Sequence, residues 1–187
     1  EKRQDYYLHK HSEAIHKTEL EYLKELDQIT NRVFSRMIQS LEGRQVVLFL
    51  SGGYDSRLVA VNLQKQGYTN VVCFSYGPED DKDVICAKEI AERIGYPLIR
   101  LDTTKDVWRE YFISSEEFKR ACCEGAYGFS IPYIQSIFLK PFVENGIIDK
   151  NAVLINGNSG DVIEGNDICS DFISGKYYMI DDVVEKI

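Results

Sequence analysis

A short loop of small and polar residues, Ser51-Gly52-Gly53-Tyr54-Asp55-Ser56, has the residue types that phosphate binding requires. It directly follows an apolar run at residues 46–50, and binding sites in open parallel sheets form at the carboxyl ends of such strands. The two glycines let the backbone turn tightly, so that amide N–H groups can converge on an anion. A helix that starts in the loop would add its partial positive charge, and Ser51 and Ser56 would supply hydroxyl donors.

Two charged residues, one in this loop and one directly after it, are candidates for catalysis. Asp55 would repel a phosphate unless a divalent cation lay between them, which makes it a candidate Mg²⁺ ligand. Arg57 could reach a phosphate or a carboxylate, although a surface salt bridge explains it equally well. The string is neither a Walker A loop, since it lacks Gly-Lys-Ser/Thr, nor a GxGxxG loop. A plain strand-to-helix turn is the alternative, but the complete SGGxDS string favours phosphate binding.

The elements that must position this loop alternate between strands and helices. Short apolar runs predict strands at residues 46–50, 71–74, 98–101 and 152–155. Three- and four-residue apolar spacing predicts helices at residues 12–42, 56–66, 83–94, 116–123 and 131–144. This alternation predicts an α/β protein with a doubly wound parallel sheet. We expect an N-terminal helical segment at residues 1–43 and one α/β domain at residues 44–187.

Composition narrows the class of protein. The 187 residues are 44% hydrophobic and 28% charged, and the net charge of −8 argues against a large nucleic-acid surface. Five cysteines without CxxC pairs fit reduced thiols in a cytoplasmic protein. We expect neither a signal peptide nor a membrane span. The first residue is Glu, so a fragment of a longer protein, truncated at its C-terminus, is one interpretation.

Residues 51–56 resemble the signature loop of the N-type ATP pyrophosphatases, the PP-loop superfamily. This group includes asparagine synthetase, GMP synthetase, NAD synthetase and several tRNA-modifying enzymes. The chain is most similar to the synthetase domain of glutamine-hydrolysing asparagine synthetase, and residues 74–95, 154–157 and 160–165 resemble further segments of that domain. The resemblance implies the adenine nucleotide alpha hydrolase-like fold, which is Rossmann-like, and cleavage of ATP with Mg²⁺ between its α and β phosphates.

The resemblance also assigns roles to single residues. Asp55, Asp161 and Arg57 would be catalytic, and Asp55, Asp83 and Asp161 would face the metal and the pyrophosphate or the substrate. For Asp83 and Asp161, capping of a helix is the alternative role. The residues expected to bind ATP are Leu50, Ser51, Gly52, Gly53, Asp55, Ser56, Tyr76, Asn156 and Gly157.

The implied reaction joins a small carboxylic acid to ammonia. The acid would be activated as an acyl-adenylate, and ammonia would come from solution or from a separate glutaminase subunit or domain. Asn158 stands where the family usually has an acid/base glutamate, and an amide cannot transfer a proton in that way. A tRNA-modifying ATP pyrophosphatase and a non-catalytic ATP-binding module therefore stay open as alternatives. An oligomer is compatible with the sequence.

Overall fold

The structure is a computed structural model, and it describes residues 17–103, 106, 109, 116 and 134–157. The described elements alternate between helices and strands, as the apolar spacing predicts. In chain order they are α1 (Glu19–Leu41), β1 (Val46–Phe49), α2 (Tyr54–Lys65), β2 (Val71–Tyr76), α3 (Lys82–Ile94), β3 (Leu98–Leu101), α6 (Ile134–Glu144) and β4 (Val153–Ile155). Residues 117–123 of the helix predicted at 116–123, and residues 131–133 of the helix predicted at 131–144, lie outside the described residues.

The described strands form one parallel sheet in the order β3-β2-β1-β4. Val46 of β1 is in register with Val71 on one side and with Val153 on the other. The chain therefore adds β2 and then β3 on one side of β1, and β4 pairs with the other side of β1. This reversal is a topological switch point, where open α/β sheets bind ligands. The predicted fold class, a parallel sheet flanked by helices, is confirmed.

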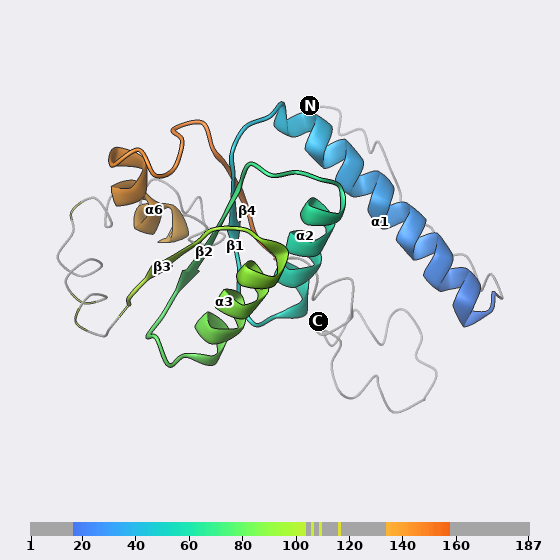
Figure 1. Cartoon of the computed structure of the whole chain (residues 1–187), viewed down its shortest axis with the longest axis horizontal. Coiled ribbons are helices and arrows are strands. Elements are labelled where there is room, and N and C mark those ends of the chain that lie inside the picture. Colours follow the sequence, from blue (N-terminus) through green and yellow to red (C-terminus); the bar gives the residue numbers. More distant parts are fainter. Residues whose placement is uncertain (1–16, 104–105, 107–108, 110–115, 117–133, 158–187) are drawn as a thin grey trace, which may run out of the picture.

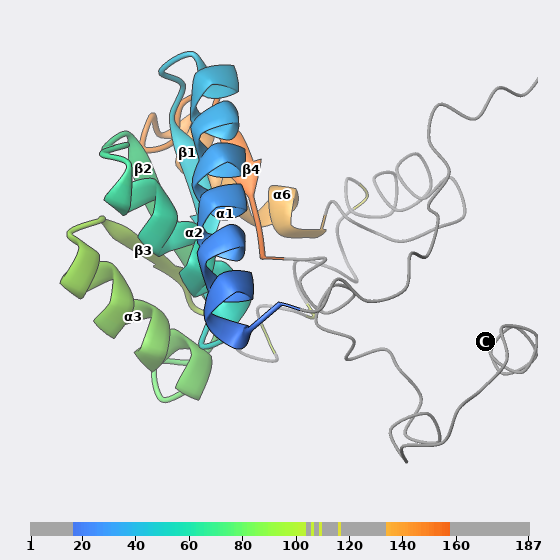
Figure 2. The same cartoon turned by 90° about the vertical axis from the view of Figure 1, so that its right-hand side faces the viewer.

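Both faces of the sheet are covered, which explains the unbroken apolar run of β1. Val46 and Leu48 join the core cluster that contains residues of α1, α2 and α3, whereas Val47 and Phe49 join the cluster that contains Leu139 of α6. All four β1 side chains are buried. Figures 1 and 2 show α2 and α3 on the face of the sheet opposite to α6. The rigid sheet fixes where the loop after β1 begins.

The long helix α1 begins at a capping box. The amide of Glu21 donates to the Thr18 hydroxyl, and the amide of Thr18 donates to the Glu21 carboxylate at 2.8 Å. Leu41, at its other end, is buried in the same cluster as the sheet, so α1 packs on the α/β core. The predicted division of the chain at residue 43 stays a prediction. No described helix has both the length and the apolar character that a membrane span requires.

Candidate functional site

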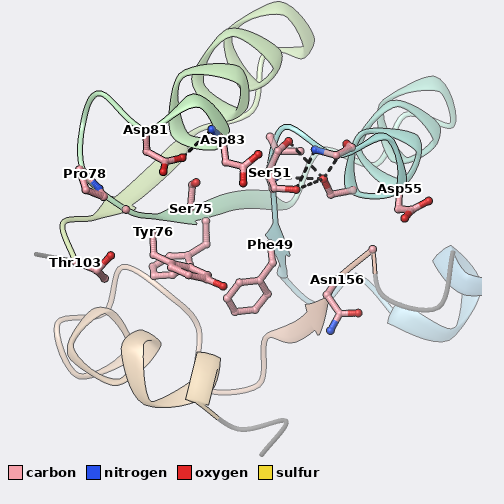
Figure 3. A pocket seen from close by; sticks show the side chains of 16 residues that line it. Phe49, Ser51, Asp55, Ser75, Tyr76, Pro78, Asp81, Asp83, Thr103 and Asn156 are labelled. Carbon is pink, nitrogen blue, oxygen red and sulfur yellow. Dashed lines mark hydrogen bonds between the residues drawn. The ribbon is translucent and has the colours of Figure 1, made fainter. Parts of the chain in front are cut away.

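A cavity of about 500 Å³ opens at the carboxyl end of the sheet, where all four described strands end. Its lining comes from the loop after β1, the end of β2, the first turn of α3, the residues after β3 and the residues after β4. Figure 3 shows these side chains around the cavity. The sheet therefore brings together five segments that are far apart in the sequence.

Two serine hydroxyl groups accept hydrogen bonds from backbone amides within the loop after β1. The Ser51 amide donates to Ser56 Oγ at 3.2 Å, and the Gly53 amide donates to Ser51 Oγ at 3.2 Å. The two hydroxyl oxygens are also 3.2 Å apart, and Ser56 is only 5% exposed. The serines were predicted to be donors to phosphate. In the structure they fix the shape of the loop, and direct contact with a phosphate stays a prediction.

Helix α2 starts inside this loop. Gly53 is its N-cap residue with φ −70° and, having no side chain, makes no capping hydrogen bond. The first turn of α2 contains Asp55 and Ser56, and both line the cavity. The partial positive charge of the helix N-terminus therefore lies at the cavity wall, where it favours an anion.

Gly52 of the loop permits close packing and has no left-handed backbone conformation. Neither Gly52 nor Gly53 has a left-handed φ, so a left-handed backbone conformation is not what requires glycine at these positions. The expected role of the glycines, a tight turn that lets amides converge on an anion, stays a prediction. A Cβ atom at position 52 would lie 2.6 Å from Asp83 Oδ1. Gly52 thus lets helix α3 approach the loop, and the Gly52 amide donates to that same carboxylate oxygen at 3.0 Å.

Asp81, rather than Asp83, caps helix α3. The Asp83 amide donates to Asp81 Oδ1 at 2.8 Å, and Asp81 is the N-cap residue. The carboxylate of Asp83 is therefore free from capping and lines the cavity beside the loop. Sequence reasoning missed Asp81, although its place just before the predicted start of the helix at residue 83 is the usual signal of a cap.

The loop after β4 packs directly on the loop after β1. A Cβ atom on Gly157 would lie 2.6 Å from the Ser56 nitrogen and 2.9 Å from Asp55 Cβ. Asn156 and Gly157 both line the cavity. The sequence predicted that these two loops act at one site, and the structure brings them into contact. Their roles in binding ATP stay a prediction.

Of the remaining predicted site residues, two line the cavity, one lies beside its loop, and one is not described by the structure. Leu50 and Tyr76 line the cavity. Arg57 does not: its Nε atom donates to the Gly53 carbonyl at 3.1 Å, and its guanidinium stacks on the Tyr54 ring at 4.2 Å from the centroid. Its contact with a phosphate stays a prediction. Asp161 lies outside the described residues.

The charge of the cavity wall is negative. Its charged side chains among the described residues are those of Asp55, Asp81 and Asp83, with no lysine or arginine. Asp55 and Asp83 lie on either side of Ser51 in Figure 3. No three potential ligand side chains in the described part of the chain are grouped as a metal site. This donor set suits a Mg²⁺ ion that takes its other ligands from phosphate and water, because Mg²⁺ usually binds through one or two carboxylates.

Sequence reasoning also missed other residues that line the cavity. Thr103, just after β3, is 7% exposed and lines it, as do Phe49 and Ser75. The aromatic rings of Phe49 and Phe74 pack edge to face with centroids 5.5 Å apart. Thr103 had no local signal, because it reaches the cavity only through the pairing of β3 with β2.

Comparisons with known proteins agree with this fold. The asparagine synthase family model matches residues 27–124. A probable glutamine-hydrolysing asparagine synthetase of Acanthamoeba polyphaga mimivirus is 34% identical over 87 residues, which cover 43% of this chain and 16% of the relative. A tRNA-specific 2-thiouridylase MnmA of Ureaplasma urealyticum is 33% identical over 99 residues, covering 41% of this chain and 26% of the relative.

A solved structure is similar to this chain in its fold. NH3-dependent NAD synthetase from Campylobacter jejuni, in complex with the nitrate ion, aligns with a TM-score of 0.51 and 16% sequence identity. The alignment covers 76% of this chain and 59% of that protein. The chain spans between about a sixth and a quarter of the length of the two curated relatives described above.

Proposed function

This chain belongs to the asparagine synthase family, within the N-type ATP pyrophosphatases, and on that basis we propose that it is the ATP-cleaving part of an amide-forming ligase. A substrate carboxylate attacks the α phosphorus of ATP, which gives an acyl-adenylate and releases pyrophosphate. Ammonia then attacks the acyl carbon and displaces AMP. The observation that carries this proposal is the contact of Gly157 with Ser56, which joins two loops of neighbouring strands around one cavity at the N-terminus of α2.

The loop residues prepare the cavity for a polyphosphate. The hydrogen bonds of Ser51 and Ser56 fix the loop before any substrate arrives, so little reorganisation is needed when charge develops. Asp55 is our candidate ligand for Mg²⁺. When bound, Mg²⁺ neutralises charge on the phosphates and stabilises the departing pyrophosphate.

The remaining walls leave room for the rest of the nucleotide and for an acid. Leu50, Tyr76 and Asn156 line the same cavity as the loop, which suits the nucleotide contacts that the sequence predicts for them. The main task of the protein is to hold the carboxylate in line with the α phosphate, because orientation alone contributes much of the rate in reactions of this kind.

Analysis of the nucleotide products tests this function. The chain is incubated with ATP, Mg²⁺ and ammonia, with and without a panel of small carboxylic acids that includes aspartate. We expect AMP and pyrophosphate only with an accepted acid, and we expect Asp55→Asn to lose the Mg²⁺-dependent turnover. Asp80→Asn is the matched control, since it removes an exposed carboxylate that does not line the cavity.

Two outcomes of this experiment would favour a different function. If the chain binds ATP but forms no AMP with any acid, a non-catalytic ATP-binding module is the better description. The relatives named tRNA-specific 2-thiouridylase support a second candidate, an ATP pyrophosphatase that activates a tRNA base. AMP formation that depends on added tRNA rather than on an acid would favour that candidate.

A further inference from the structure

Three consecutive backbone amides in the loop after β1, those of residues 51–53, already donate to an acceptor within the protein. Ser51 donates to Ser56 Oγ, Gly52 donates to Asp83 Oδ1, and Gly53 donates to Ser51 Oγ. Only the Gly52 acceptor carries a charge, and only that acceptor lies outside residues 51–56, in the first turn of α3. This hydrogen bond ties together residues that are 31 positions apart.

The Asp83 carboxylate occupies the kind of position that a phosphate oxygen would take at this amide. Both are anionic oxygens, and a backbone N–H forms its strongest hydrogen bonds with such acceptors. The absence of a Cβ on Gly52 is what allows the approach, since a Cβ would lie 2.6 Å from the same Oδ1 atom. The amide cannot donate fully to Asp83 and to a phosphate at the same time.

We propose that Asp83, which lines the cavity, is a positioning residue of the loop after β1: it holds the Gly52 amide beside the cavity and competes there with the phosphate group of the ligand. This inference rests on the proposed function in one respect, the binding of a phosphate at the loop. It gives Asp83 a role different from that of a metal ligand, because a positioning residue acts on the Gly52 amide even when no Mg²⁺ is bound.

Binding of pyrophosphate without Mg²⁺, measured by titration calorimetry, tests the competition for the Gly52 amide. Asp83→Asn keeps an acceptor oxygen but removes the charge, so the phosphate displaces it more easily. A hydrogen bond to a charged group contributes enough that we expect affinity to rise by roughly tenfold or more. Asp80→Asn makes the same change of charge three residues earlier and should raise the affinity by much less. Equal affinities for the two variants, or weaker binding by Asp83→Asn, would overturn the proposal.

Hydrogen exchange at the loop provides a second readout that does not need a ligand. Asp83→Ala removes the acceptor, so the Gly52 amide should exchange faster than in the unchanged chain. Asp83→Asn should restore slow exchange, because its side-chain oxygen can accept the same hydrogen bond. Exchange that is equal in the unchanged chain and in Asp83→Ala would overturn the positioning role.

The two readouts distinguish this inference from the proposed function. If the chain forms AMP but the Asp83 variants behave like Asp80→Asn, only the inference fails. If the chain forms no AMP, the calorimetry and the exchange data still decide the role of Asp83. If pyrophosphate does not bind at all, competition with phosphate is refuted and exchange alone tests whether Asp83 positions the loop.

Discussion

Replacing Gly157 by alanine would force the two loops of the cavity apart. The added Cβ would lie 2.6 Å from the Ser56 nitrogen, whereas ordinary contacts begin at 3.4 Å, so the loops must separate by about 0.8 Å. The atoms in the way are mainly backbone atoms of Asp55 and Ser56, which cannot rotate aside. Overpacking of this kind costs about 1–3 kcal/mol, and the lower entropy of the unfolded alanine chain offsets about 0.4–1 kcal/mol. We expect a net loss of about 1–2 kcal/mol.

Thermal unfolding and AMP formation measure the two consequences of Gly157→Ala. For a chain of this size the loss corresponds to a Tm lower by about 2–8 °C. The rate of AMP formation should fall by roughly tenfold to a hundredfold, because a displacement near 1 Å misaligns reacting groups. Gly52→Ala is the control: its Cβ meets the end of the Asp83 side chain, which can rotate away, so its Tm should fall less. A Gly157→Ala chain with unchanged Tm and unchanged activity would refute this reasoning.

Two further predictions concern thiol reactivity and pH. Burial raises the pKa of Cys73 to about 12. Its thiol should therefore react with iodoacetamide far more slowly than the thiol of half-buried Cys86. Equal labelling of the two cysteine-containing peptides, measured by mass spectrometry, would contradict this. Hydrogen bonds from the Thr18 amide and hydroxyl lower the pKa of Glu21. The stabilisation from Glu21 is therefore present above the usual pKa of glutamate and is lost as the pH falls through the lowered value. Glu21→Gln should make the acid-side decrease in Tm shallower, and an unchanged slope would count against the capping box.

Local patterns were sufficient to predict most of the described elements. The strand expected at residues 98–101 is β3 without change, and the helix expected at 83–94 is α3 with one more residue at its start. The apolar run at residues 46–50 was expected to be buried on both faces, and the four residues of β1 are. These features are predictable because burial on one or two faces of an element imposes a period on its own residues.

The sequence also singled out the loop of the candidate site, but it left the partners of some residues undetermined. Gly52 was expected to permit a tight turn, and the structure adds that it permits the approach of Asp83. Asp83 was expected either to cap its helix or to face a ligand, and the cap is Asp81. In each case the partner of a side chain was unknown, so residue type alone left more than one role open.

The sequence by itself was enough to predict most of the described elements and the parallel α/β class, and to single out residues 51–56 as a candidate phosphate-binding loop, because each depends on neighbouring residues along the chain. Only the tertiary structure decided that β4 pairs with β1, which sets Gly157 against Ser56. It alone placed Thr103 in the cavity wall and turned Arg57 onto Tyr54. Such contacts join residues that are far apart in the chain or depend on the direction of one side chain, and packing of the whole sheet fixes them rather than any local pattern.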